Sequence, residues 1–132
     1  MNRTVLVVDD MAYVRQVLIK ILTAHHFKVV GEAENGSQAV ALYQKPSPDV
    51  VTMDVVMPEM SGVEATRRIV RLDSSARIIV ISGLGHENLF LDAIGAGARD
   101  YILKPFQEEH VIRTLEHVLV GSDALTKRTK SL

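Results

Sequence analysis

Hydrophobic positions along the chain follow two alternating patterns. Short runs rich in Val and Ile are separated by longer segments in which apolar residues recur every three or four positions. The short runs are typical of strands that are buried on both faces, and the longer segments are typical of amphipathic helices. The alternation therefore predicts an α/β fold, with a five-stranded parallel sheet that is covered by helices on both faces.

The same pattern gives approximate limits for each element. In the first helix, Val14, Leu18, Ile21 and Leu22 share one face, which should pack on the sheet. The predicted strands are residues 4–8, 29–33, 50–53, 78–81 and 101–103. The predicted helices are residues 12–24, 37–44, a segment that follows residue 62, a segment between residues 86 and 96, and residues 107–120.

Chain length and composition suit one compact domain. The 132 residues are 47% hydrophobic, which is enough apolar material for a single core. We expect the domain to occupy residues 1–120. Residues 121–132, "GSDALTKRTKSL", lose the apolar period and are mostly polar, so we expect a flexible C-terminal tail that is also suited to start a linker.

Charge and cysteine content narrow the classes of partner. With 15 basic and 16 acidic residues the net charge is −1, which gives no general electrostatic reason to bind nucleic acid directly or to bind an acidic membrane. The chain has no cysteine, so disulfides and thiolate metal sites are excluded. Its apolar runs are too short to insert into a membrane, and the N-terminus does not resemble a signal peptide. A cytoplasmic protein with protein or small-ligand partners is expected.

Polar side chains stand at the ends of four predicted strands. Asp9 and Asp10 follow the first strand, Asp54 the third, Ser82 the fourth and Lys104 the fifth. The carboxyl ends of parallel strands meet at one edge of the sheet, where ligands of open α/β sheets bind. We therefore expect these five side chains to converge there, with Asp54 presented at the edge and not buried in the core.

This combination of groups indicates phosphoryl chemistry. Three crowded carboxylates repel one another, so they call for a cation, and Mg²⁺ prefers hard oxygen ligands and few carboxylates. A divalent cation beside Lys104 and the Ser82 hydroxyl would stabilise a transferring phosphoryl group, with Asp54 as the nucleophile. Taken singly, Asp9 or Asp10 could instead cap the first helix, Ser82 could be a turn residue and Lys104 a surface lysine.

Four segments, "VLVVDD", "VTMDVVMPEMSG", "IIVIS" and "GARDYILKPF", resemble the receiver domain of two-component response regulators. They lie between residues 5 and 106, within a likeness that covers residues 4 to about 120 and is greatest to the single-domain chemotaxis regulators of the CheY kind. The resemblance implies a flavodoxin-like (βα)5 fold with the strand order 2-1-3-4-5. It also implies a signalling switch that catalyses only its own phosphorylation and dephosphorylation.

The resemblance further implies how the acids are used. Asp54 would accept a phosphoryl group from a histidine kinase (CheA-like). Mg²⁺ would be held by Asp10 and Asp54, by Asp9 through water, and by the backbone carbonyl of Val56. No other cofactor is implied.

The remaining implied roles concern the switch. Ser82 would donate a hydrogen bond to a phosphoryl oxygen, and Lys104 would pair with the phosphoryl charge. Tyr101 would turn inward when Ser82 moves, which would remodel the face made by the fourth helix, the fifth strand and the fifth helix. That face would bind an output protein such as a flagellar switch component. The Lys104–Pro105 bond would be cis.

Two apolar positions suggest that self-dephosphorylation is unassisted. Val56 stands two residues after Asp54, and Leu84 stands two residues after Ser82. Neither side chain can orient an attacking water, so a separate phosphatase is a possible partner.

Other interpretations stay open. A flavin-binding flavodoxin shares the layout, but Asp9 and Asp10 would repel the flavin phosphate. A phosphatase with an aspartate nucleophile, of the kind that resembles haloacid dehalogenases, would need a second acid where Val56 stands. Among receivers, a phosphorelay carrier, a receiver excised from a longer regulator and a degenerate docking module are the alternatives.

Overall fold

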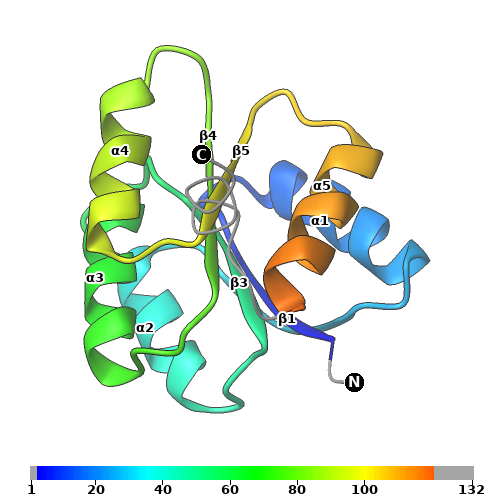
Figure 1. Cartoon of the computed structure of the whole chain (residues 1–132), viewed down its shortest axis with the longest axis horizontal. Helices are drawn as coiled ribbons and strands as arrows, with labels where there is room; N and C mark the ends of the chain where they lie inside the picture. Colours follow the sequence, from blue (N-terminus) through cyan, green and yellow to red (C-terminus); the bar gives the residue numbers. More distant parts are fainter. Residues whose placement is uncertain (1–2, 121–132) are drawn as a thin grey trace, which may run out of the picture.

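The computed structural model describes residues 3–120, which form five strands alternating with five helices (Figure 1). The strands are β1 (Thr4–Val8), β2 (Lys28–Ala33), β3 (Val50–Asp54), β4 (Ile78–Ser82) and β5 (Asp100–Leu103). The helices are α1 (Ala12–Ala24), α2 (Gly36–Gln44), α3 (Gly62–Leu72), α4 (Glu87–Ala96) and α5 (Glu108–Leu119). Neighbouring strands pair in parallel in the order β2-β1-β3-β4-β5, which confirms the predicted flavodoxin-like (βα)5 fold.

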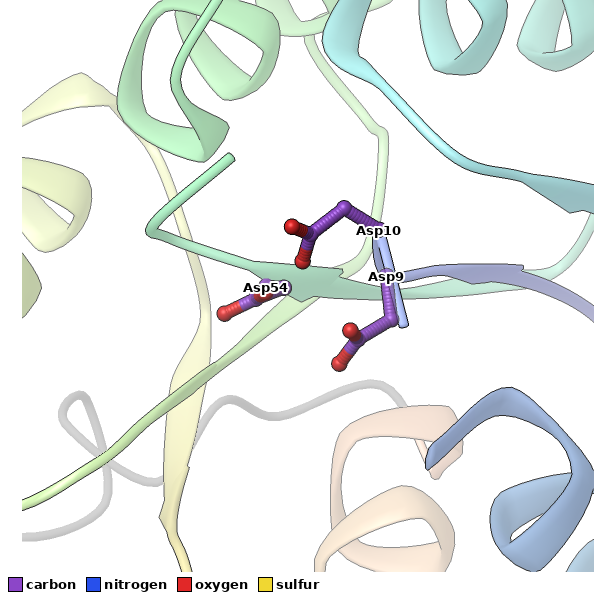
Figure 2. Close-up of side chains that lie close together, drawn as sticks. All are labelled: Asp9, Asp10 and Asp54. Atoms are coloured by element: carbon purple, nitrogen blue, oxygen red, sulfur yellow. The ribbon is translucent and has the colours of Figure 1, made fainter. Parts of the chain in front are cut away.

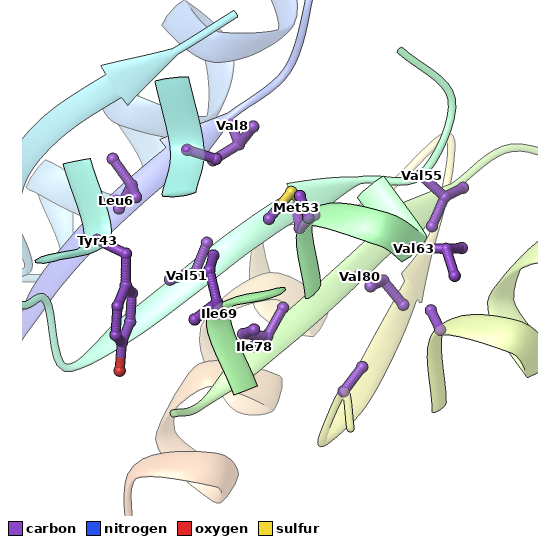
Figure 3. Close-up of a cluster of buried hydrophobic side chains, with 14 of the residues drawn as sticks. Leu6, Val8, Tyr43, Val51, Met53, Val55, Val63, Ile69, Ile78 and Val80 are labelled. Carbon is purple, nitrogen blue, oxygen red and sulfur yellow. The ribbon is translucent and has the colours of Figure 1, made fainter. Parts of the chain in front are cut away.

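Helices cover both faces of the sheet, with α1 and α5 on one face and α2, α3 and α4 on the other (Figure 1). Because side chains alternate across a strand, each central strand contributes to two cores. Val5 packs with Leu18 and Leu115 on the α1/α5 face. Leu6 packs with Ile69 on the opposite face (Figure 3). The strands are therefore fixed from both sides, and they provide a rigid support for the residues at their ends.

Predicted and observed strand limits differ by at most one residue. The prediction ends the third and fourth strands too early, because β3 runs to Asp54 and β4 to Ser82. Asp54 is paired with Ile81, and Ser82 is paired with Leu103. The ladder uses backbone groups, so a polar side chain does not end a strand.

No helix within residues 3–120 combines the length and the apolar character that a membrane span requires. The predicted tail, residues 121–132, lies outside the described residues. The domain limit at residue 120 therefore stays a prediction.

The ends of α2 and α3 are joined by a hydrogen bond that offers a test of the packing. The hydroxyl of the buried Tyr43 donates to Asp73 Oδ2 at 2.7 Å. Tyr43→Phe is expected to lower the free energy of unfolding by about 1–2 kcal/mol at pH 7, because a charge-assisted hydrogen bond is lost. Urea unfolding measures this loss, and Tyr13→Phe, at a 76% exposed position, is the control that should change little.

This cost should depend on pH. The Ser75 hydroxyl and then the Tyr43 hydroxyl hold the pKa of Asp73 below its ordinary value of 3.8. The stabilisation is therefore complete above the unfolded pKa and is lost as the pH falls through the folded pKa. The difference between wild type and Tyr43→Phe should shrink as the pH drops below about 4. A difference that is the same at every pH would contradict this account.

Candidate functional site

Three carboxylates meet at the carboxyl edge of the sheet (Figure 2). Asp9 and Asp10 follow β1, and Asp54 is the last residue of the neighbouring strand β3. One oxygen from each carboxylate lies within 4.8 Å of the others. The structure therefore brings Asp54 together with Asp9 and Asp10, which lie more than forty positions earlier in the sequence.

Hydrogen bonds fix both the side chain and the backbone of Asp9. Its Oδ1 accepts the Met11 N–H at 2.9 Å, and its carbonyl oxygen accepts Arg15 Nη1 at 2.7 Å. Met11 is the N-cap of α1 and makes no side-chain capping bond, so the alternative in which Asp9 or Asp10 caps the helix is wrong. The helix begins too late for either acid to serve as its cap, and Asp9 instead orders the turn that precedes it.

Arg15 is a supporting residue that the sequence pattern does not single out. Besides its bond to the Asp9 carbonyl, its Nε donates to Glu32 at 3.0 Å. An arginine on an amphipathic helix ordinarily faces solvent. The only feature of the sequence that indicates a supporting role for Arg15 is its position, one turn after the acids. It joins the backbone of Asp9 to β2.

Asp54 lies at the end of its strand as predicted, but the residue is only 5% exposed, so the expectation of an acid presented outside the core is wrong. Burial and then repulsion from Asp9 raise the pKa of Asp54 from 3.8 to about 7, against the opposing effect of Lys104. The Val56 N–H donates to Asp54 Oδ1 over a long 3.4 Å. The loop after β3 begins directly beside this carboxylate.

That loop depends on a close backbone approach. The Gly62 N–H donates to the Val55 carbonyl oxygen at 3.1 Å, and a Cβ at Gly62 would overlap the Asp54 carbonyl oxygen. Only glycine can start α3 directly against the end of β3. The side chain of Val56 points outward, with 45% of it exposed.

Lys104 supplies the positive charge of the site. Its Nζ lies 3.2 Å from Asp9 Oδ2 and 3.7 Å from Asp54 Oδ1, so it contacts two of the three acids. Its backbone N–H donates to the Ser82 carbonyl oxygen at 2.8 Å, which fixes the end of β5 to the end of β4. The Lys104–Pro105 bond is cis, as the resemblance implies.

Ser82 and Tyr101 occupy positions that suit their predicted roles. Ser82 is 1% exposed, and its Oγ has no hydrogen-bond partner within residues 3–120. A buried hydroxyl without a partner is unfavourable, so it is available for a ligand oxygen. Tyr101 is half-buried, and its ring packs on Phe90 with 4.4 Å between ring centroids.

The donor set fits a small, hard divalent cation. Asp9, Asp10 and Asp54 offer carboxylate oxygens and leave positions for water, which suits Mg²⁺ better than Ca²⁺. The raised pKa of Asp54 also indicates a need for a cation, because Lys104 alone does not offset the negative charge of the three acids. The ligand role of the Val56 carbonyl stays a prediction.

An open five-stranded parallel sheet with buried acids and a lysine at its carboxyl edge defines a receiver-type fold and site. The family model of the response regulator receiver domain matches residues 5–116. The chain therefore belongs to the response regulator receiver domain family.

Within that family the chain is similar to chemotaxis regulators. It is 47% identical to the chemotaxis protein CheY of Bacillus subtilis, over 90% of this chain and 99% of that protein. It is 46% identical to CheY of Thermotoga maritima, over 89% and 98% of the two chains. Among solved structures, a CheX–CheY–BeF3–Mg complex from Borrelia burgdorferi matches with a TM-score of 0.81 and 34% identity, over 89% and 88% of the chains. The chain is a two-component response regulator.

Proposed function

We propose that this response regulator is a chemotaxis switch that is turned on by phosphorylation of Asp54. The observation that carries the proposal is the meeting of Asp9, Asp10 and Asp54 within 4.8 Å, with Lys104 in contact with two of them. The likeness to proteins named CheY over nearly their full length favours chemotaxis. A phosphorelay carrier, or a receiver from a longer regulator, is the second candidate.

In the proposed reaction the Asp54 carboxylate attacks the phosphorus of a phosphohistidine on a histidine kinase. A P–O bond to Asp54 forms, the P–N bond breaks, and the imidazole nitrogen leaves with the bonding electron pair and takes up a proton. Lys104 Nζ pairs with the charge on the phosphoryl oxygens, and Ser82 Oγ donates a hydrogen bond to one of them.

Asp9, Asp10, Asp54 and the Val56 carbonyl would hold Mg²⁺. When bound, the cation supplies positive charge that offsets the acids and the phosphoryl oxygens. The protein thereby catalyses its own modification, and it acts as a signalling switch rather than as an enzyme with turnover of an external substrate.

Signal output would follow from a shift between two conformations. Movement of Ser82 toward the phosphoryl group would open space for Tyr101, which would leave its packing on Phe90 and remodel the α4-β5-α5 face. A change from 1:99 to 99:1 needs about 5.5 kcal/mol. Two or three charge-assisted hydrogen bonds of about 1.5–3 kcal/mol each would supply it.

The proposed output partner is a flagellar switch component. Leu91 of α4 and Leu103 of β5 are 60% and 41% exposed, so the α4-β5-α5 face offers apolar contacts. The kinase would be CheA-like, a separate phosphatase would end the signal, and these partners would place the protein in the cytoplasm. The receiver would end near residue 120, with the tail at 121–132 beyond it.

Trapping the activated state tests this function. The protein is loaded with beryllofluoride and Mg²⁺ and is mixed with purified flagellar switch protein or with a histidine phosphotransfer protein. Binding of the switch protein to the loaded form, and not to a loaded Asp54→Ala variant, is expected. Capture of the phosphotransfer protein alone would favour the relay. A wild-type protein that acetyl phosphate and Mg²⁺ cannot phosphorylate at Asp54 would overturn the proposal.

Val56→Asn should shorten the life of the phosphorylated state. The amide would reach the open side of Asp54 and orient a water, which the exposed Val56 side chain cannot do. We expect a three- to tenfold shorter half-life, or about 0.7–1.4 kcal/mol in activation free energy. Loss of ³²P from phosphorylated protein measures it, and Leu72→Asn, at an exposed position on α3, is the control. An unchanged half-life would remove Val56 as a cause of slow hydrolysis.

A further inference from the structure

Methionines gather around the acid site. The chain has five methionines and no cysteine, so thioethers are its only sulfur groups, which are the usual targets of mild oxidants. Four of them lie within residues 3–120, and each stands within six positions of Asp10 or Asp54 in the sequence: Met11, Met53, Met57 and Met60. A peroxide that oxidises this protein would therefore act on the surroundings of the phosphorylation site.

Met57 and Met60 anchor the loop that joins β3 to α3. Met57 is 8% exposed and belongs to the apolar cluster on the α2/α3/α4 face, together with Val55, which Figure 3 shows. Met60 is half-buried and packs against the same cluster. Pro58 and Glu59, which lie between the two methionines, are exposed. The two thioether side chains therefore hold this loop on the core.

Met60 also joins the loop to the start of α2. A Cβ at Gly36, the first residue of α2, would lie 2.8 Å from both the Cγ and the carbonyl oxygen of Met60. Loop and helix are therefore in direct contact there. Ser61, the next residue, is the N-cap of α3, and its hydroxyl accepts the Glu64 N–H. Met60 thus lies where the loop, α2 and α3 meet.

The turn between the two methionines is strained. Glu59 has a φ of 67°, in the left-handed region that few residues other than glycine adopt. Such a conformation persists only where the surrounding structure holds it. The same loop starts at Asp54, and it carries the Val56 N–H that donates to Asp54 Oδ1. Loss of an anchor would therefore also displace the phosphoryl acceptor.

We propose that Met60 is a reversible oxidation site that controls the phosphorylation of Asp54. The inference rests on the proposed function and adds a form of regulation at that same site. The oxidant is hydrogen peroxide. The sulfur lone pair attacks one peroxide oxygen, an S–O bond forms and the O–O bond breaks. The leaving hydroxide takes the remaining proton and departs as water, so sulfur loses the two electrons that the peroxide gains. A methionine sulfoxide reductase reverses the change.

Oxidation would remove the anchor because it makes an apolar side chain strongly polar. A sulfoxide at Met60 would be held against the apolar cluster, where burial of an unpaired polar group is unfavourable. The side chain would leave the cluster and release the loop. Met11 differs, because it is 55% exposed and its sulfoxide would be hydrated. Met53 is fully buried and shielded from the oxidant.

Peroxide treatment followed by phosphorylation tests the site. Wild type, Met60→Leu and Met11→Leu are treated with hydrogen peroxide, and their sulfoxides are mapped by peptide mass spectrometry. The rate of phosphorylation by acetyl phosphate is then compared with that of each untreated protein. Treatment should slow wild type and Met11→Leu by about fivefold or more, and it should leave Met60→Leu within about twofold.

A substitution that imitates the sulfoxide removes the need for the oxidant. Met60→Gln places a polar group of similar length at the anchor, so without peroxide it should be phosphorylated about fivefold more slowly than the wild type. Leu72→Gln introduces the same amide at an exposed position on α3 and should leave the rate within about twofold. A wild-type rate in Met60→Gln would contradict the proposal.

Several results of the peroxide experiment would overturn the inference. Met60 would stay a thioether while Met11 is converted, or its sulfoxide would leave the rate unchanged. Equal slowing of Met60→Leu and wild type would place the effect at Met57. Loss of the native far-UV circular dichroism spectrum would make the whole fold the target. A rate that stays low after a reductase has restored Met60 would exclude reversible control. Failure of acetyl phosphate to modify untreated wild-type Asp54 would instead count against the proposed function.

Discussion

Asp54→Asn is expected to be more stable than the wild-type protein when divalent cations are chelated, and to accept no phosphoryl group. Burial and the neighbouring Asp9 raise the pKa of Asp54 from 3.8 to about 7, so at neutral pH the folded state holds an unfavourable carboxylate. A pKa difference of this size corresponds to about 4 kcal/mol, and we expect the amide to recover about 2–4 kcal/mol. Urea unfolding in EDTA at pH 7.5 measures the gain.

The gain has a defined pH dependence. Since the folded pKa of Asp54 is raised, the wild type is favoured below the unfolded pKa and loses stability as the pH rises from about 4 to 7. Wild type and Asp54→Asn should therefore be similar near pH 4 and diverge toward pH 7.5. Asp92→Asn removes an exposed carboxylate of α4 and should show no such divergence.

Magnesium provides a second check on the same prediction. Because the cation should bind the folded site and not the unfolded chain, it should raise the Tm of the wild type in a concentration-dependent way. The difference in Tm between the wild type and Asp54→Asn should therefore become smaller as Mg²⁺ is added. An Asp54→Asn protein that melts below the wild type in EDTA would show that repulsion among the acids does not govern the site.

Gly62→Ala is expected to destabilise the protein by about 3 kcal/mol or more. A Cβ at this position would overlap the Asp54 carbonyl oxygen and lie 2.8 Å from the Cα of Val55. Both neighbours are backbone, and β3 is held by its pairing with β4, so neither side can give way easily. The end of β3 should shift, which would also slow phosphorylation of Asp54.

Gly95→Ala is the matched control for this substitution. Gly95 lies inside α4, and a Cβ there would meet no atom within 4 Å. Alanine favours a helix interior over glycine, so this variant should gain about 0.5–1 kcal/mol. Urea unfolding measures the change in the free energy of unfolding for both variants. A Gly62→Ala protein with wild-type stability and phosphorylation would show that the loop relaxes around the added methyl group.

Much of the site follows from the sequence because parallel strands have one fixed polarity. Once the apolar runs are assigned to strands, Asp9, Asp54, Ser82 and Lys104 must stand at the same edge of the sheet. Side chains alternate across each strand, so Met53 of β3 and Ile79 of β4 lie in the two different cores, on opposite faces of the sheet.

The features of the site that the sequence does not predict depend on how the loops pack at the carboxyl edge of the sheet. Crowding of the acids predicts that repulsion raises the pKa of Asp54, as it does. Periodicity places Asp54 at a strand end but says nothing of how deeply it is buried, so the sequence does not predict its 5% exposure or the larger contribution of burial to the raised pKa. The bond from Arg15 to the Asp9 carbonyl and the approach of Gly62 to Asp54 arise from three-dimensional packing alone. A single sequence gives no local signal for such contacts.

The contact between Lys104 and Asp9 joins positions 95 residues apart, so it closes only when the first and last strands are both in place. A chain that is still being synthesised, or one that proteolysis has shortened before β5, would hold all three acids without the ammonium group that accompanies them. Such a fragment should be a poor phosphoryl acceptor even if its kinase is active. The protein could then signal only after the whole sheet has formed. Incomplete copies of the chain would not transmit a signal.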